Sequence, residues 1–199
     1  MTHQVYLLMV GEMAFDQFRQ IRHIVGQQVA LPWRPMAGIA MPGMIQRPDI
    51  KVNHGIVMAG AQGIGKDTAL HPLRIGVGEW NTAEIEPDDV NGQYNGYIKS
   101  VMLVINEVRP LDEHHHASNF YNRIKPLLAA PPDMLPMHLK YANIIHVRNL
   151  CHVFMTTNEP LKMYIPEEDR RLFVMTSPMP EPDQPGGFDS EYFVRFWDY

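Results

Sequence analysis

Three glycines and one lysine follow the spacing that wraps a phosphate chain. Gly60 and Gly65 are separated by four residues, with Gly63 between them, and Lys66 follows directly. Backbone N–H groups surround a phosphate closely only where Cβ atoms are absent, and the lysine neutralises the β- and γ-phosphates. The apolar run 56–58 precedes this loop, and residues able to start a helix follow it. We therefore predict a phosphate-binding loop, in preference to a glycine-rich turn with an exposed lysine.

The residue after the loop lysine departs from the usual pattern. Ser or Thr normally binds Mg²⁺ at this position, but Asp67 occupies it here and Thr68 comes next. Both side chains carry oxygen, the ligand atom that Mg²⁺ prefers, so the sequence leaves the choice between them open. The candidate nucleotide-binding residues are consecutive: Gly60, Ala61, Gln62, Gly63, Ile64, Gly65, Lys66, Asp67 and Thr68.

Two further apolar runs end in polar residues that suit nucleotide chemistry. The run 100–105 is followed by Asn106 and Glu107, and the run 151–155 leads to Asn158. This pattern is typical of buried parallel strands, whose carboxyl ends open onto a shared crevice. We predict that Glu107 polarises the attacking water, that Asn106 faces Mg²⁺ or supports one of its ligands, and that Asn158 contacts the γ-phosphate or the water. The alternatives are a solvent-exposed carboxylate for Glu107 and a turn or cap residue for Asn158.

Two consecutive arginines, Arg170 and Arg171, precede the last strand-like run, 172–175. A guanidinium matches phosphate geometry, and one supplied by a neighbouring subunit would couple hydrolysis to assembly. The acidic residues 167–169 directly before them offer a structural ion pair instead. The sequence does not decide between these two roles.

The rest of the chain is expected to support one main domain. At 199 residues, with 45% hydrophobic and 20% charged residues, the composition is that of an ordinary globular protein with a sizeable core. Apolar residues over 15–29 follow the period of one helix face, and four prolines over 31–49 indicate an extended connection. We expect an N-terminal helix and proline-rich connection over 1–49, a P-loop ATPase core over 50–177, and a Pro/Gly-rich linker with a short helix over 178–199.

Between the motifs the core gives weaker signals. Residues 68–73 should begin a helix that Pro72 limits or bends. The segment 76–96 is rich in Gly, Asn and Asp and indicates irregular surface structure, whereas 120–128 predicts a helix. Residues 134–149 alternate weakly between apolar and polar, which favours a β-hairpin.

Few residues outside these motifs suggest another binding site. Three consecutive histidines, 114–116, cannot all face one metal from a regular element, so a solvated loop is preferred to a metal site. The single cysteine, Cys151, excludes an internal disulfide and is expected to be buried. A formal charge of −5 argues against a surface covered by nucleic acid but leaves room for a local basic contact.

No apolar run approaches the length of a membrane span, because prolines and an arginine interrupt the richest one. The N-terminus also lacks a basic region followed by an uninterrupted apolar core, which is the pattern of a secretory signal. We therefore expect a cytoplasmic protein that does not associate with membranes.

Five segments follow one another along the chain: GAQGIGKDT, VMLVINEV, FYNRIKPLLAAPP, CHVFMTTNEP and EEDRRLFVM. In this order they resemble the helicase domain of phage and prophage primase-helicases, a group similar to superfamily-three helicases within the AAA+ class. The resemblance runs from about Phe15 to Ser177. It implies an α/β P-loop core with a parallel sheet flanked by helices, ATP and Mg²⁺ as cofactors, and a hexameric ring that moves single-stranded DNA through its centre.

The resemblance also implies residue roles. It places Walker A at Gly60 to Thr68, Walker B at Asn106 and Glu107, the sensor at Asn158, and the finger at Arg170 or Arg171. Lys140, with His138 close by, falls where the family's DNA-contacting hairpin lies. Asn106 stands where many relatives have Asp, which puts metal affinity in doubt. Because no primase domain is recognisable, a fragment or a stand-alone module with a primase partner is expected.

The sequence thus predicts an ATP-dependent DNA helicase or translocase module of a phage-type replication system. Two alternatives stay open. One is a non-hydrolysing, nucleotide-dependent scaffold or loader, for which Asn106 and Asp67 would be signs of lost hydrolysis. The other is a small-molecule kinase that shares only the phosphate loop.

Overall fold

The computed structural model describes residues 41–108, 114–159, 165–166, 168–189 and 191–197. The helix expected over 15–29 lies outside these described residues. The α-helices are α3 (Met41–Gln46), α4 (Lys66–Val77), α5 (Pro87–Asn91), α6 (His114–Leu128) and α7 (Tyr192–Trp197), with 3₁₀ turns η2 (Glu79–Asn81) and η3 (Gly96–Lys99). The strands are β1 (Gly55–Ala59), β2 (Thr82–Ile85), β3 (Met102–Ile105), β4 (Met134–Met137), β5 (Ile145–Arg148), β6 (His152–Thr157) and β7 (Leu172–Thr176).

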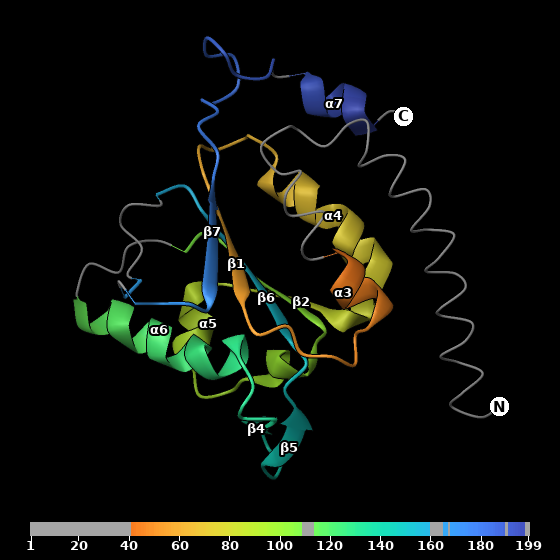
Figure 1. The fold of residues 1–199 in the computed structure, drawn as a ribbon, viewed down its shortest axis with the longest axis vertical. Coiled ribbons are helices and arrows are strands. Elements are labelled where there is room, and N and C mark those ends of the chain that lie inside the picture. Colours follow the sequence, from red (N-terminus) through yellow and green to blue (C-terminus); the bar gives the residue numbers. More distant parts are fainter. Residues whose placement is uncertain (1–40, 109–113, 160–164, 167, 190, 198–199) are drawn as a thin grey trace, which may run out of the picture.

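A five-stranded sheet organises the described residues, with the strand order β2-β3-β6-β1-β7. Every neighbouring pair in it is parallel, so the carboxyl ends of all five strands meet at one edge of the sheet. In Figure 1 this edge lies at the top, where β1 turns into α4. The predicted fold class, an α/β P-loop core with a parallel sheet flanked by helices, is confirmed.

Helices cover both faces of the sheet, which explains why its central strands are continuous apolar runs. On one face, Met58, Val104 and Phe154 pack with residues of α3 and α4. On the other face, Val57 and Leu103 pack with residues of α5 and α6. The alternation of side chains along each strand therefore feeds two cores, one on either side of the sheet. The cysteine in this second core is fully buried, as expected.

Strand β2 is a correction to the sequence analysis, which expected irregular structure over 76–96. Its four residues, Thr82–Ile85, pair with β3 at the edge of the sheet. The strand is short, only partly buried and flanked by turn-forming residues, so it lacks the apolar run that revealed β1, β3 and β6. Half-buried edge strands give the weakest sequence signal because only part of the strand contacts the core.

Three helices also differ from expectation. Helix α4 continues past Pro72 to Val77, because its residues Leu70 and Leu73 are fully buried in the core and offset the lost backbone hydrogen bond. Helix α6 begins at His114, not at residue 120, so the histidine run is helical and not a loop. Helix α3 lies within the segment 31–49 that was expected to be extended; its proline falls in the first turn, where helices tolerate it.

The predicted hairpin over 134–149 is confirmed: β4 and β5 pair in antiparallel register. Figure 1 shows it at the end of the molecule opposite the β1–α4 loop. Asn95 holds the end of β4 next to the hairpin loop, since the Asn95 side chain accepts from the His138 amide at 2.7 Å and donates to the Pro136 carbonyl at 3.0 Å. Within the described ranges, none of the helices combines the length and apolar character needed to cross a bilayer.

A histidine buried in β6 gives the fold a pH dependence that we can predict. His152 is 5% exposed, and its Nε2 has no hydrogen-bond partner among the described residues. Burial, together with the charges of Lys51 and His54, lowers the pKa of His152 from 6.5 to about 4. The unfolded chain therefore binds the proton more tightly, so this stability is fully present above pH 6.5 and is lost as the pH falls toward 4.

Replacing His152 by Gln removes this dependence. Between pH 7 and pH 5, the free energy of unfolding of the wild type should fall by about 2 kcal/mol more than that of His152→Gln, as follows from the two pKa values. Urea denaturation at both pH values measures the difference. Parallel losses in the two proteins would contradict the assignment of this titration to His152.

Candidate nucleotide-binding site

The loop between β1 and α4 has the backbone shape that requires glycine. Gly63 and Gly65 have φ angles of +74° and +82°, in the left-handed region that other residues rarely adopt. A Cβ on Gly63 would also lie 2.8 Å from Pro182 Cγ. The chain after β7 therefore packs against the loop closely enough to exclude a side chain there. Two independent restraints thus fix glycine at position 63.

Lys66 begins α4, and its side chain lies across the loop. Its Nζ donates to the carbonyl oxygens of Gly60 and Ala61, each at 2.8 Å, and to Asn158 Oδ1 at 2.7 Å. No side chain caps the N-terminus of α4, so the amides of its first turn face the loop with the positive end of the helix dipole. This arrangement attracts an anion to the space enclosed by the loop.

Glu107 follows β3 in a strained backbone conformation that aims its side chain. Its φ angle is +46°, which is uncommon for a residue with a Cβ and recurs at functional sites. The neighbouring strand holds this shape: the Glu107 amide donates to Thr156 Oγ1 at 3.2 Å, and the Val108 amide donates to the Thr156 carbonyl at 2.8 Å. Glu107 is thereby turned toward the loop instead of continuing the strand.

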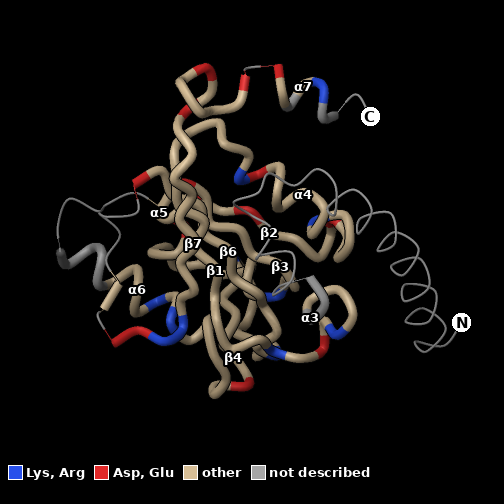
Figure 2. Tube along the Cα trace, turned by 45° about the horizontal axis from the view of Figure 1, so that its top comes forward, with Lys and Arg blue, Asp and Glu red and all other residues tan. Residues whose placement is uncertain are grey.

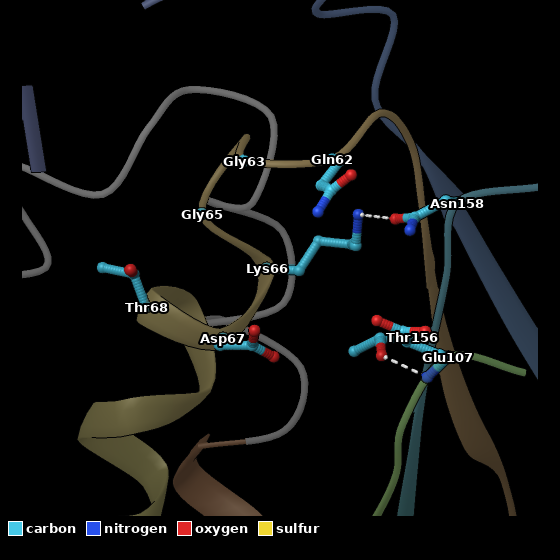
Figure 3. A pocket seen from close by; sticks show the side chains of 9 residues that line it. All are labelled: Gln62, Gly63, Gly65, Lys66, Asp67, Thr68, Glu107, Thr156 and Asn158. Carbon is cyan, nitrogen blue, oxygen red and sulfur yellow. Dashed lines mark hydrogen bonds between the residues drawn. The ribbon is translucent and has the colours of Figure 1, made fainter. Parts of the chain in front are cut away.

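These residues line one cavity of about 270 Å³ at the carboxyl edge of the sheet. Its lining consists of Gln62, Gly63, Gly65, Lys66, Asp67, Thr68, Glu107, Thr156 and Asn158. Figure 3 shows Lys66 reaching toward Asn158 from one wall, with Glu107 and Thr156 on the facing wall. An adjoining cavity of about 340 Å³ shares Gln62, Glu107 and Asn158. The structure thus brings Lys66, Glu107 and Asn158 together, as expected from the carboxyl ends of parallel strands; in the sheet, β6 lies between β1 and β3.

The charges in the cavity oppose one another. Burial lowers the pKa of the Lys66 ammonium, while the nearby carboxylates of Asp67 and Glu107 raise it. Figure 3 shows Asp67 pointing toward the wall that carries Glu107, whereas Thr68 points to the other side. With one ammonium and two carboxylates, the charges of the cavity favour binding of a polyanion only when a cation binds with it.

Asn106 does not line this cavity. Its Nδ2 donates to Glu84 on β2, and Glu84 also pairs with Arg74 of α4 at 2.7 Å. Burial raises the pKa of Glu84, but the hydrogen bonds from Asn106 and Arg74 and the charge of Arg74 outweigh it and hold the pKa below its usual range. Asn106 therefore does not face the space around Lys66, and its side chain instead links β3 to β2 and α4.

The remaining candidates lie at the other end of the sheet. Arg170 and Arg171 precede β7, and the Arg171 carbonyl accepts from the amide of Gly55 at the start of β1, 2.7 Å away. Lys140 is exposed at the hairpin tip, 5.0 Å from the ring centroid of Tyr141, which is 94% exposed. None of the candidates at this end lines the cavity around Lys66. His138 directly follows β4, where the hairpin loop begins.

The charge of Arg171 has a local use. Asp169 accepts hydrogen bonds from the Tyr121 hydroxyl and from the amides of Arg171 and Leu172. Burial raises the pKa of Asp169, but these hydrogen bonds and the charge of Arg171 outweigh it and lower the pKa. Of the two roles considered for the arginines, the effect of its charge on Asp169 favours the structural ion pair for Arg171, whereas Arg170 is exposed.

Sequence reasoning missed two parts of the site. Thr156, which orients Glu107, lay inside the motif TTN but gave no signal of its own, because a threonine in a strand is ordinary. The Arg74–Glu84–Asn106 network joins residues far apart in the sequence and depends on β2, the strand that was not expected. Had a strand over 82–85 been predicted from the sequence, its pairing would have placed Glu84 beside the end of β3.

Comparisons with known proteins concern the fold that carries this site. The model of a family described as "Family of unknown function (DUF5906)" matches residues 58–171, from within β1 to the residue directly before β7. No curated protein sequence matches the chain. A structure described as the apo form of the NrS-1 C-terminal region has a TM-score of 0.67 at 19% identity, covering 88% of this chain and 43% of that chain. An A-form apo structure of the same region has a TM-score of 0.63 at 18% identity, covering 94% of this chain and 42% of that one.

At this level of identity, the likeness to NrS-1 shows a shared fold. The chain spans less than half the length of the NrS-1 structures that it matches. A structure of NtrX from Brucella abortus in complex with ATP has a TM-score of only 0.42 at 15% identity, covering 89% of this chain and 43% of that chain.

Proposed function

Since the chain belongs to the family of unknown function DUF5906, whose description assigns no activity, we propose from the site itself that it is an ATP-hydrolysing module of a DNA helicase or translocase. The observation that carries the proposal is the meeting of Lys66, Glu107 and Asn158 in one cavity at the carboxyl edge of the sheet. A lysine in a glycine loop, a carboxylate and an amide at strand ends are the groups that ATP hydrolysis requires.

Nucleotide binding follows from the loop and the helix behind it. The loop amides and the N-terminus of α4 would surround the β- and γ-phosphates, and Lys66 would exchange its contacts with Gly60, Ala61 and Asn158 for phosphate oxygens. A charge-assisted contact to phosphate is stronger than the neutral ones that Lys66 makes here. The loop is therefore built to accept a triphosphate with little rearrangement of the backbone.

Mg²⁺ fits the donors in the cavity. Asp67, Thr68 and Glu107 line it and offer hard oxygens, which Mg²⁺ prefers. The described residues hold no group of three His, Cys, Asp or Glu that could bind a metal without help. Mg²⁺ in phosphate sites usually takes one or two carboxylates together with phosphate oxygens, so it would arrive with the nucleotide and neutralise charge there.

Hydrolysis would then depend on Glu107. Its carboxylate, fixed by the backbone at Thr156, would accept a proton from a water molecule as that water attacks the γ-phosphorus. The bond between the γ-phosphorus and the β–γ bridging oxygen breaks, releasing ADP and phosphate. Asn158, which accepts from Lys66 in this structure, would turn its amide toward the γ-phosphate or the water.

A ring of subunits would complete the site. Arg170 lies before β7, at the end of the sheet opposite the cavity, and so cannot reach the nucleotide of its own subunit. A neighbouring subunit of a homo-oligomeric ring, hexameric by the resemblance, could supply it as a finger. Arg171 would instead hold Asp169 in place.

Single-stranded DNA would contact the hairpin. Lys140 is exposed at its tip. Lys and Arg residues occur at the end of the molecule that carries β4, together with Asp and Glu (Figure 2). His138 directly follows β4, where the hairpin loop begins, and is half-buried. A local lysine contact can follow a phosphate backbone even though the whole chain is acidic.

Lys140→Ala should lower the affinity for single-stranded DNA by about threefold to tenfold and reduce the slope of log affinity against log salt by about 0.7 for each lysine in contact. Its basal ATP hydrolysis should stay close to that of the wild type, because the hairpin lies far from the cavity. Fluorescence anisotropy of a labelled oligonucleotide at several salt concentrations measures both quantities. Lys140→Arg keeps the charge and should bind as the wild type does; unchanged binding by Lys140→Ala would remove Lys140 from the DNA path.

The proposal is tested by measuring ATP hydrolysis with and without single-stranded DNA, together with the size of the particle in solution. Turnover that DNA stimulates in a ring-sized particle supports the helicase class. One rival has an observation in its favour: Asn106 adds no carboxylate to the cavity, as a non-hydrolysing scaffold or loader would allow. That rival predicts nucleotide binding without turnover. Turnover in a monomer that ignores DNA would instead indicate a small-molecule kinase.

A further inference from the structure

Two positions in the site carry the opposite chemistry from that of most phosphate loops. The position after the loop lysine normally holds a hydroxyl, and the strand that binds the metal normally ends in aspartate. Here the loop position is Asp67 and β3 ends in the neutral Asn106. We infer that the two positions have exchanged roles, so that Asp67 supplies the carboxylate ligand of Mg²⁺. This inference rests on the proposed nucleotide binding.

The side chain of Asp67 points where a metal ligand is needed. Asp67 is exposed in the first turn of α4 and lines the cavity together with Glu107. In Figure 3 its carboxylate points toward the wall formed by Glu107 and Thr156, beneath the Lys66 side chain. Thr68 points to the opposite side of the helix start. The sequence left open whether Asp67 or Thr68 binds Mg²⁺. The directions of the two side chains on the helix favour Asp67.

Asn106 is held in a network that disfavours a carboxylate at its position. Its Nδ2 donates to Glu84, which is already paired with Arg74 at 2.7 Å. An aspartate at 106 would lose this donor and place a second negative charge against Glu84. The single Arg74 would then face two carboxylates. The network therefore disfavours a carboxylate at position 106, whereas the Asp67 carboxylate lines the cavity.

The exchange changes how nucleotide binding should depend on the metal. Without Mg²⁺, the Asp67 carboxylate repels the phosphates that the loop surrounds, whereas a hydroxyl would not. With Mg²⁺, the same carboxylate becomes a ligand and favours binding. Removing the charge should therefore have opposite effects in the two conditions. A residue that merely stabilised the helix start would not reverse sign in this way.

The test is a titration of wild type and Asp67→Asn with fluorescent ADP, in EDTA and in excess Mg²⁺. Mg²⁺ should raise the affinity of the wild type about 100-fold, and that of Asp67→Asn about tenfold or less. The difference is the charge pair between the Asp67 carboxylate and Mg²⁺, which accounts for about a tenfold change in affinity. In EDTA, Asp67→Asn should bind more tightly than the wild type. Asp88→Asn, which removes an exposed acid from the first turn of α5, is the matched control and should behave as the wild type does.

A second variant tests whether the carboxylate itself is needed. Asp67→Ser restores the usual hydroxyl without the charge, and Asn106, which does not line the cavity, supplies no carboxylate in its place, so the Mg²⁺ gain should be about as small as that of Asp67→Asn. Urea midpoints establish that each variant is folded. A wild-type gain in Asp67→Asn or in Asp67→Ser, or loss of the gain in Thr68→Ala alone, would each overturn the inference and leave the proposed function standing. A wild type that binds no nucleotide with Mg²⁺ would overturn both.

Discussion

Replacing Glu107 by Gln is expected to lower the rate of ATP hydrolysis by about 100- to 1000-fold, the usual contribution of a general base. The substitution keeps the shape of the side chain and its ability to contact water, but an amide cannot accept the proton that the attacking water must lose. The affinity for nucleotide should stay within about threefold of the wild type, since Glu107 lies across the cavity from the loop that holds the phosphates. Phosphate release and a fluorescent-nucleotide titration measure the two quantities separately.

The backbone at this position makes the Gln variant the right one. With a φ angle of +46°, Glu107 occupies a conformation that a shorter or β-branched residue would disturb, so Ala or Val would confuse lost chemistry with lost shape. Glu79→Gln, an exposed carboxylate on η2, serves as the control and should hydrolyse ATP at the wild-type rate. Full turnover in Glu107→Gln would assign the base elsewhere, and absent turnover in the wild type would favour the scaffold.

The placement of Glu107 and Asn158 could be predicted because parallel strands impose it. A buried apolar run identifies such a strand, and its carboxyl end must lie at the same edge as those of its neighbours. What the sequence did not reveal was the order of the strands. Pairing partners depend on which helices cross over which face, and β6 came to lie between β1 and β3. The convergence does not depend on this order, because one intervening strand is narrow compared with the reach of Glu107 and Lys66.

Asn106 shows where sequence reasoning stops. Its position at a strand end suggested a metal contact, but successive residues of a strand face opposite sides of the sheet. Asn106 follows Met102 and Val104, which face α3 and α4, and it meets Glu84 there. Only the presence of β2 determines this partner, and β2 is the strand with the weakest signal. The unexpected edge strand β2 thus changed the interpretation of Asn106, whereas the interpretation of the other site residues did not depend on it.

The hairpin shows the opposite case, in which a weak pattern was sufficient. Alternation over 134–149 predicted two short strands, and their register places Leu135 and Met137 in the core while Met134 stays exposed. Period-two alternation is informative for a two-stranded unit because only one of its faces is covered. Lys140 then falls at the tip by counting alone. What remains a proposal is the ligand that the tip contacts.

Replacing Lys66 by Met should weaken nucleotide binding by about 10- to 100-fold, which corresponds to the loss of one hydrogen bond from a charged group to phosphate. Methionine retains most of the apolar stem, so the packing at the start of α4 is preserved. The carbonyls of Gly60 and Ala61 and the amide of Asn158 lose their donor, but they line an open cavity where water can replace it. Titration with a fluorescent nucleotide in Mg²⁺ measures the loss.

A stability measurement makes this result specific to binding. The free energy of unfolding of Lys66→Met without nucleotide should stay within about 1 kcal/mol of the wild type, because Lys66 is only half-buried. Burial also lowers the pKa of its ammonium, so the charge itself does not favour the folded state. Lys99→Met, at an exposed lysine of η3, should change neither quantity. If Lys66→Met binds nucleotide as tightly as the wild type does, the loop does not hold the phosphates, and the roles proposed for Glu107 and Asn158 fail with it.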